Sequence, residues 1–121
     1  MGFSWGKAMA SESLATRERA IALLEQYESL LTESQAQVMD DYYRYDLSLG
    51  EIAELRGISR AGVSDSLRKS IAKLEEIDGK LGLVEERATF KKLFLEAESA
   101  PTDQDKLEAY RAIGKAYNHG I

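Results

Sequence analysis

Apolar residues recur every three or four positions along most of the chain, and no stretch alternates apolar and polar residues for long enough to predict a strand. A step of three or four residues places side chains on one face of an α-helix. The first predicted helix runs from about Thr16 to Ser29. Its apolar face consists of Ala20, Leu23, Leu24 and Tyr27. The pattern therefore predicts an all-α protein.

Two capping boxes predict where the next two helices begin. In such a box, the first hydroxyl accepts the backbone N–H three residues later, and the side chain at that later position bonds back. Thr32 and Gln35 open a helix that ends near Arg44, and Ser48 and Glu51 open a shorter helix. The residues that the first of these helices is expected to bury are Val38, Met39 and Tyr42.

Three tyrosines cluster in the segment DDYYRYD, and aromatic side chains between charges can stack on nucleic-acid bases. The three aspartates beside them make that use electrostatically unfavourable. We therefore expect Tyr42 and Tyr45 to pack in the core or between helices, and Tyr43 to be partly exposed.

Residues 49–68, LGEIAELRGISRAGVSDSLR, have the spacing of a helix-turn-helix. Small Ala53 allows the two helices to cross closely, and Gly57 provides the positive φ of a tight turn. Ser59 caps the second helix, which continues to about Asp78. The apolar positions are Ile52, Ile58, Val63 and Leu67, of which Ile58 and Val63 are expected to face inward and fix the crossing angle.

The second helix of this motif is the predicted recognition helix. Its buried stripe consists of Val63, Leu67, Ile71 and Leu74. The candidate nucleic-acid-binding residues are Ser59, Arg60, Ser64, Arg68, Lys69 and Lys73. Arg60 and Ser64 are expected to reach base edges, whereas Arg68 and Lys69 bind phosphates. The alternative is that these residues form the solvated face of an ordinary helical hairpin.

Three residues of this segment depart from a simple DNA-binding pattern. Asp65 would repel a phosphate, so it reads a cytosine amine, caps a neighbouring arginine, or marks a surface that meets protein. Arg56 stands where such motifs usually have an apolar residue, so the first helix is rotated or Arg56 reaches out to solvent. Gly62 lies inside a helix, at a cost of up to about 1 kcal/mol relative to alanine, and close approach of a backbone or a partner would explain it.

Composition narrows the classes of function. The 121 residues carry a formal charge of −5, which argues against a protein that coats nucleic acid non-specifically. Residues 48–74 alone are basic, with a net charge of +2, although an excess of this size is also ordinary composition. The chain has no cysteine, and its single histidine, His119, has no catalytic constellation around it. We therefore expect that the protein is not an enzyme, that it binds no metal or cofactor, and that it does not span a membrane.

The apolar seam of the recognition helix continues beyond the motif. It comprises Leu67, Ile71, Leu74, Ile77 and Leu81, and it is expected to pack either on a helix at about 84–98 or on the same seam of a second chain. A last helix begins after Pro101 with Thr102 as its cap. Its apolar face comprises Leu107, Tyr110, Ile113 and Tyr117. We divide the chain into a flexible leader at 1–13, a helix-turn-helix domain at 14–80, and a helical extension at 81–121 that caps the chain or makes a homodimer.

The stretch YYRYDLSLGEIAELRGISRAGVSDSLRKSIAKLE resembles region 4 of sigma-70-type factors. It is more similar to the YlxM-like family of small helix-turn-helix proteins, which are encoded near the signal-recognition-particle GTPase in Gram-positive bacteria. The similarity lies in the leading segment LLTESQAQVMDDYYRYDLSLGEIAE, the Ser59-Arg60 opening of the recognition helix, and the run VSDSLRK at 63–69. The resemblance covers roughly residues 18–98.

The resemblance implies a cytoplasmic, all-helical protein with a part in the signal recognition particle pathway, through the RNA or the GTPase of the particle. Two functions remain open. The first is a regulator that binds DNA or RNA through Arg60, Ser64, Arg68 and Lys69, which the resemblance favours. The second is an adaptor that keeps the helix-turn-helix as a scaffold and binds the GTPase or a second copy of itself, which the overall acidity and Asp65 favour.

Overall fold

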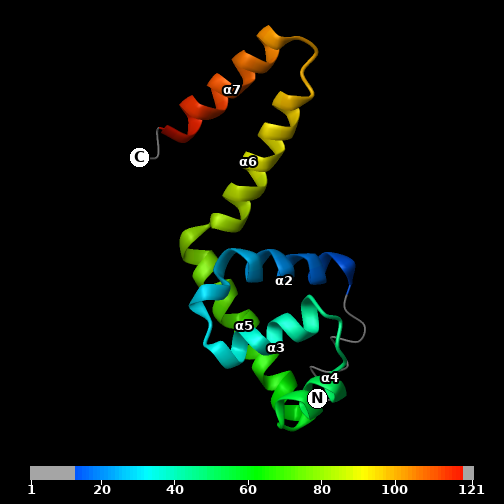
Figure 1. Cartoon of the computed structure of the whole chain (residues 1–121). Coiled ribbons are helices and arrows are strands. Elements are labelled where there is room, and N and C mark those ends of the chain that lie inside the picture. Colours follow the sequence, from blue (N-terminus) through cyan, green and yellow to red (C-terminus); the bar gives the residue numbers. More distant parts are fainter. Residues whose placement is uncertain (1–12, 119–121) are drawn as a thin grey trace. The chain divides into compact units, whose positions relative to one another are not determined.

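A computed structural model describes residues 13–118 of the chain (Figure 1). The helices are α2 (Leu14–Tyr27), the 3₁₀ turn η1 (Glu28–Leu30), α3 (Glu33–Tyr43), α4 (Leu49–Arg56), α5 (Arg60–Leu81), α6 (Leu83–Glu98) and α7 (Asp103–Asn118). No strand occurs among these residues. The predicted all-α helix-turn-helix fold is confirmed. The leader predicted at 1–13 falls, except for its last residue, outside the described residues, as does His119.

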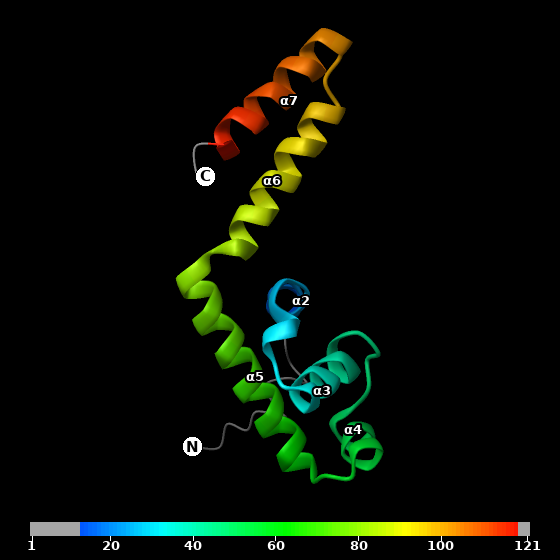
Figure 2. The ribbon, with the colours of Figure 1, turned by 60° about the vertical axis from the view of Figure 1, so that its left-hand side comes forward.

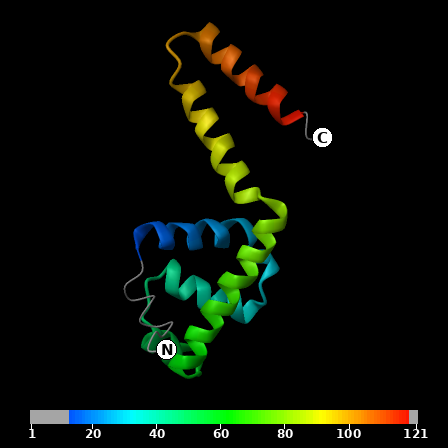
Figure 3. The ribbon, with the colours of Figure 1, turned by 180° about the vertical axis from the view of Figure 1, so that it is seen from behind.

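The chain divides into two compact units, of which the first ends at Leu81 and the second begins at Gly82. In the first unit, α2, α3 and α4 all contact α5. Figure 2 shows these three helices on the same side of α5, and Figure 3, the view from behind, shows α5 running past α2 and α3. The long helix α5 therefore serves as the support on which the helix-turn-helix and the two preceding helices are assembled.

Each α-helix of the first unit contributes buried side chains to its core. Its largest fully buried apolar side chains are Leu23 and Leu24 of α2, Val38 and Met39 of α3, Ile52 of α4, and Val63, Leu67 and Leu74 of α5. Fully burying one such aliphatic side chain stabilises a fold by about 1.5–3 kcal/mol. Ile71, which we expected in the buried stripe, is half-buried, and Ser70 lies in the core instead.

The predicted capping boxes at the starts of α3 and α4 are confirmed. The amide of Gln35 donates to Thr32 Oγ1 at 3.2 Å, and the amide of Thr32 donates back to Gln35 Oε1 at 3.1 Å. Ser48 and Glu51 make the same reciprocal pair at 3.0 and 3.1 Å. The bond to Ser48 lowers the pKa of Glu51 because it favours the charged carboxylate. These local bonds determine where α3 and α4 begin.

Three side chains near α3 and the turn of the helix-turn-helix differ in burial from the prediction. Tyr43 is buried at 4 % exposure, whereas Tyr45 is 68 % exposed and Ile58 is 43 % exposed. The helix ends at Tyr43, and the amides of Arg44 and Tyr45 both donate to the carbonyl of Asp40. The chain then passes through a left-handed residue at Asp46, so Tyr45 no longer continues the helical face.

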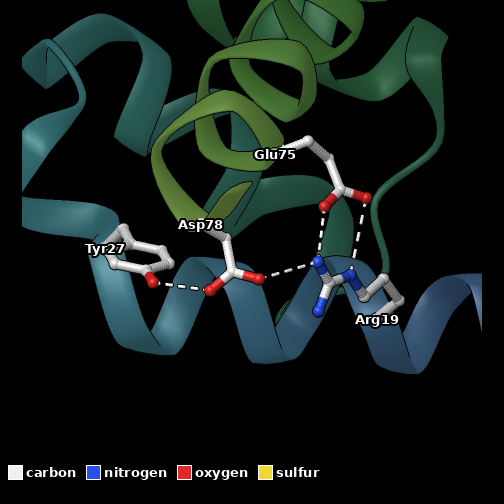
Figure 4. Close-up of polar contacts among 4 residues, drawn as sticks. All are labelled: Arg19, Tyr27, Glu75 and Asp78. Atoms are coloured by element: carbon white, nitrogen blue, oxygen red, sulfur yellow. Dashed lines mark hydrogen bonds and ion pairs between the residues drawn. The ribbon is translucent and has the colours of Figure 1, made fainter. Parts of the chain in front are cut away.

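A polar clasp connects α2 to the C-terminal half of α5 (Figure 4). Arg19 Nη2 lies 2.6 Å from Glu75 Oε1 and 2.9 Å from Asp78 Oδ2. The hydroxyl of Tyr27 donates to the other oxygen of Asp78 at 2.6 Å. Hydrogen bonds to Glu75 and Asp78 raise the pKa of Arg19. The clasp fixes the middle and the C-terminal end of α2 against α5.

The second unit is a hairpin of α6 and α7. Thr102 caps α7 by accepting the Asp105 amide at 3.0 Å, as predicted. Aromatic contacts connect the two helices, with centroid separations of 4.9 Å for Phe90 and Tyr117 and 5.4 Å for Phe94 and Tyr110. Ile113 of the predicted apolar face is buried, but Leu107 is 43 % exposed.

Candidate nucleic-acid interface

The turn between α4 and α5 has the geometry that the sequence predicts. Gly57 adopts φ 69° and ψ 35°, the left-handed conformation that glycine tolerates best, and ends α4. The Ser59 hydroxyl accepts the Gly62 amide at 2.9 Å and caps α5. A Cβ at Gly62 would lie 3.1 Å from that hydroxyl oxygen, so Gly62 leaves room for the cap. This local contact accounts for the glycine without any partner.

The recognition helix α5 buries Val63 and Leu67 and leaves its opposite side exposed. On that side, Arg68 and Lys69 are exposed, and Ser64 and Lys73 lie half-buried along its edges. Arg60 is exposed at the N-terminal end of α5, on the face that turns toward α4. The structure therefore places four of the six predicted site residues along the outer side and flanks of α5, with Arg60 at its N-terminal end. The sixth, Ser59, acts as the helix cap at its start.

Arg60 extends across the first turn of α4. A Cβ at Gly50 would lie 3.2 Å from Arg60 Nη2 and 3.3 Å from Nε, so the guanidinium packs directly over this glycine. Arg60 makes no ion pair within the described part of the chain. Its position at the junction of the two motif helices leaves the cation available to a ligand that approaches the N-terminus of α5.

Asp65 holds two of the candidate cations. Its carboxylate pairs with Arg68 through one oxygen and with Lys69 Nζ through the other, at 3.0 Å in the second case. These partners lie three and four residues further along the helix, so all three side chains share its outer face. Of the three roles predicted for Asp65, the structure shows one: its carboxylate caps the neighbouring cations. Arg68 and Lys69 are thus partly neutralised by the chain itself.

Three arginines elsewhere in the first unit have partners in other elements, and Arg44 also pairs with Asp40 of its own helix. Arg17 pairs with Asp46, Arg19 with Glu75 and Asp78, and Arg44 with Glu28 and Asp40. Arg44, held by both carboxylates, has a pKa raised above its ordinary value, first by the hydrogen bond to Glu28. Arg60 and Lys73, in contrast, have no ion pair among residues 13–118. Residues 60–73 of α5 carry four cations and one carboxylate.

Arg56, which departs from the usual motif, proves to be structural. Its Nε and Nη2 donate to the two oxygens of Asp41 in α3 at 2.8 and 2.9 Å. The Asp41 side chain is 6 % exposed, so the guanidinium neutralises a buried carboxylate, and the bond raises the pKa of Arg56. The sequence did not reveal this pair, because Asp41 and Arg56 lie on different helices and no local spacing connects them.

Within residues 13–118, no helix is both long enough and apolar enough to cross a lipid bilayer. The same residues include no group of three or more His, Cys, Asp or Glu side chains that could hold a metal ion.

Two tightly connected helices, a left-handed glycine between them and an exposed second helix define this chain as a helix-turn-helix protein. The model of family UPF0122, described as "Putative helix-turn-helix protein, YlxM / p13 like", matches residues 14–112, and the chain belongs to this family. The predicted family resemblance is confirmed.

Relatives of known sequence carry the same family name. A UPF0122 protein of Shouchella clausii is 42 % identical over 91 residues, which cover 75 % of this chain and 84 % of the relative. A UPF0122 protein of Symbiobacterium thermophilum is 38 % identical over 96 residues, 79 % of this chain and 90 % of that one. A third, from Acetivibrio thermocellus, is 48 % identical over 65 residues, 54 % of this chain and 56 % of the relative.

Proposed function

We propose that the protein is a nucleic-acid-binding regulator and that the outer face of α5 meets the polyanion. One observation carries this proposal: Arg60, Arg68, Lys69 and Lys73 project from one helix with Asp65 as the single carboxylate among residues 60–73. At 1.5 Å per residue, the four cations span about 20 Å, a length over which several phosphates of a duplex can be neutralised.

The residues divide into positioning and recognition roles. Ser59 fixes the start of α5, and Arg60 and Ser64 near that start reach base edges. Arg68, Lys69 and Lys73 bind phosphates and set the orientation of the helix. Exposed ion pairs at a spacing of three or four residues are weak, so a phosphate can replace Asp65 as the partner of Arg68 and Lys69.

Physical chemistry favours a duplex with an open major groove as the ligand. The major groove of B-form DNA admits an α-helix, whereas the major groove of A-form RNA is too narrow for side chains to read. An RNA ligand would therefore offer an irregular or widened region to α5. The family resemblance favours the RNA of the signal recognition particle in the cytoplasm, and this ligand is tested beside DNA. Neither binding mode requires a catalytic group or a cofactor.

The proposal is tested by fluorescence anisotropy with a labelled 20-base-pair DNA duplex and with a bacterial signal-recognition-particle RNA, over a series of salt concentrations. For duplex DNA, each neutralised phosphate contributes about 0.9 to the slope of log K against log salt. We expect Arg68→Ala and Lys73→Ala each to lower that slope by about 1, and Arg60→Ala to weaken binding to base-specific sites most.

A matched control removes the same charge from the other unit. Lys92 of α6 is exposed and has no ion pair among the described residues, so Lys92→Ala changes the net charge as Lys73→Ala does. We expect Lys92→Ala to leave the slope unchanged. The proposal would be contradicted if Lys73→Ala and Lys92→Ala lowered the slope equally. It would also be contradicted if the protein bound neither nucleic acid at 50 mM salt.

A second candidate function, an adaptor that binds protein, is favoured by a different observation. Leu55 and Ile58 beside the turn are 59 % and 43 % exposed, and an exposed apolar pair is typical of a contact with another protein. The GTPase of the signal recognition particle is the partner that the family resemblance favours. A pull-down with this GTPase that survives nuclease and is lost in Ile58→Ser would support the adaptor function over nucleic-acid binding.

A further inference from the structure

The hairpin of α6 and α7 has too little core to be stable by itself. Ala97 and Ile113 are the only apolar side chains within residues 83–118 that are buried. Units of fewer than about 40 residues usually need a disulfide, a metal or a partner for stability. The chain has no cysteine, and no metal-binding cluster occurs in its described part. The hairpin therefore requires additional burial from a partner surface.

An open apolar groove of about 390 Å³ lies between the two helices. Leu93 and Ala97 line it from α6, and Ala109, Ala112, Ile113 and Ala116 line it from α7. Glu96 is the one charged residue in its lining. The alanines of α7 are separated by three and four residues, so they form one straight seam that permits a second helix to approach closely.

We propose that this groove receives α7 of a second copy of the chain in antiparallel orientation, so that two hairpins form a four-helix dimer. An isologous contact of this kind buries the same seam on both copies. It also opposes the dipoles of the two α7 helices, so that each N-terminus lies near the C-terminus of the other. The dimer thus supplies the apolar burial that the hairpin lacks.

The charges beside the seam identify a second copy as the occupant. Glu108 and Lys115 are seven residues apart, so they lie on the same flank of α7, next to Ala109 and Ala112. Within one chain they are about 10 Å apart along the axis and cannot pair directly. In an antiparallel pair, Glu108 faces Lys115 of the partner subunit, and Lys115 faces Glu108 of the partner subunit. The flank is therefore complementary to itself.

The test measures the dimer dissociation constant of the full chain by sedimentation equilibrium. We expect wild type at 100 µM to show twice the monomer mass of 13.5 kDa. Lys115→Glu replaces two attractions between copies by two repulsions, and we expect the dissociation constant to rise by roughly tenfold or more. The double variant Glu108→Lys with Lys115→Glu restores the opposite charges and is expected to return it to within about threefold of wild type.

Arg111→Glu serves as the matched control. Arg111 is exposed on the side of α7 opposite the seam, and its substitution changes the net charge by the same amount. A dissociation constant unchanged in Arg111→Glu and rescued in the double variant supports the antiparallel dimer. A monomeric wild type at 100 µM, which would mean that the groove is covered within one chain or by another protein, overturns the proposal. Equal effects of Lys115→Glu and Arg111→Glu overturn it as well.

Discussion

At the scale of single residues, Asp65 sets how strongly the recognition helix attracts a polyanion. The hydrogen bond from Lys69, followed by that from Arg68, lowers the pKa of Asp65 below its ordinary value of 3.8. Because its folded-state pKa is lowered, the pairing stabilises the fold above the unfolded pKa and is lost only as the pH falls through the lowered value. Asp65 is therefore fully ionised from pH 5 to pH 8 and repels phosphate throughout this range.

Asp65→Asn is expected to strengthen binding of the DNA duplex about threefold to tenfold at 100 mM salt, because it removes the one carboxylate among residues 60–73 and retains the side-chain shape. Anisotropy titrations at pH 5.5 and pH 7.5 should give the same ratio of variant to wild type. Asp103→Asn at the start of α7 makes the same charge change in the other unit and should have a much smaller effect. Weaker or unchanged binding in Asp65→Asn would show that the carboxylate itself is part of recognition.

Gly57 and Gly79 form a matched pair for testing the turn. Neither has a neighbouring atom within 4 Å of an added Cβ, but only Gly57 has a positive φ. We expect Gly57→Ala to lower the free energy of unfolding by about 1 kcal/mol through backbone strain. Gly79→Ala, inside α5, should raise it by about 0.5–1 kcal/mol. Urea unfolding followed by circular dichroism measures both, and a stabilising Gly57→Ala would contradict the left-handed turn.

At the scale of helices, the clasp between α2 and α5 predicts the effect of losing one hydroxyl. Tyr27 is 2 % exposed, and its hydroxyl donates to the carboxylate of Asp78. Because hydrogen bonds to charged groups are among the stronger ones, Tyr27→Phe should lower the free energy of unfolding by about 1–2 kcal/mol.

Tyr45→Phe is the control for this variant. Tyr45 is 68 % exposed, and its hydroxyl has no bonding partner within residues 13–118, so its loss should change stability by less than about 0.5 kcal/mol. The comparison uses urea unfolding of both variants. Similar stabilities of the two variants would mean that the bond from Tyr27 to Asp78 adds nothing measurable to the attachment of α2 to α5.

The helices also show what local sequence can predict. Hydroxyl caps at Thr32, Ser48 and Ser59 act within three residues, so the beginnings of α3, α4 and α5 follow from the sequence. The pairing of Arg56 with Asp41 joins two helices, and only the folded arrangement determines it. The predicted environments of Tyr43 and Tyr45 are wrong, because burial there depends on the residue at which α3 ends.

The candidate site was predictable in part for the same reason. The outward side of α5 follows from the apolar stripe at Val63 and Leu67, which fixes the helix rotation. The two pairs of Asp65 have spacings that the sequence already displays. The packing of Arg60 over Gly50 was not predictable, because it depends on the angle at which α4 meets α5.

At the scale of the whole molecule, a net charge of −5 coexists with a basic face on one helix. Such an asymmetry favours binding in one orientation, because the acidic remainder is repelled by the same polyanion that the basic face attracts. A dimer through α7 would present two such faces and raise the apparent affinity for a ligand that reaches both. If the affinity for nucleic acid rises over the same range of protein concentration in which the dimer forms, the two proposals are connected.

The most direct test of the central claim is an NMR titration of the ¹⁵N-labelled full chain with a 20-base-pair DNA duplex, and in parallel with the signal-recognition-particle RNA. Because the method reports on every amide, it does not presuppose the site. We predict that the largest shift changes fall within residues 59–73 and that α2 and α6 change little. Largest changes in helices other than α5, or an unchanged spectrum with both ligands at low salt, would contradict the account.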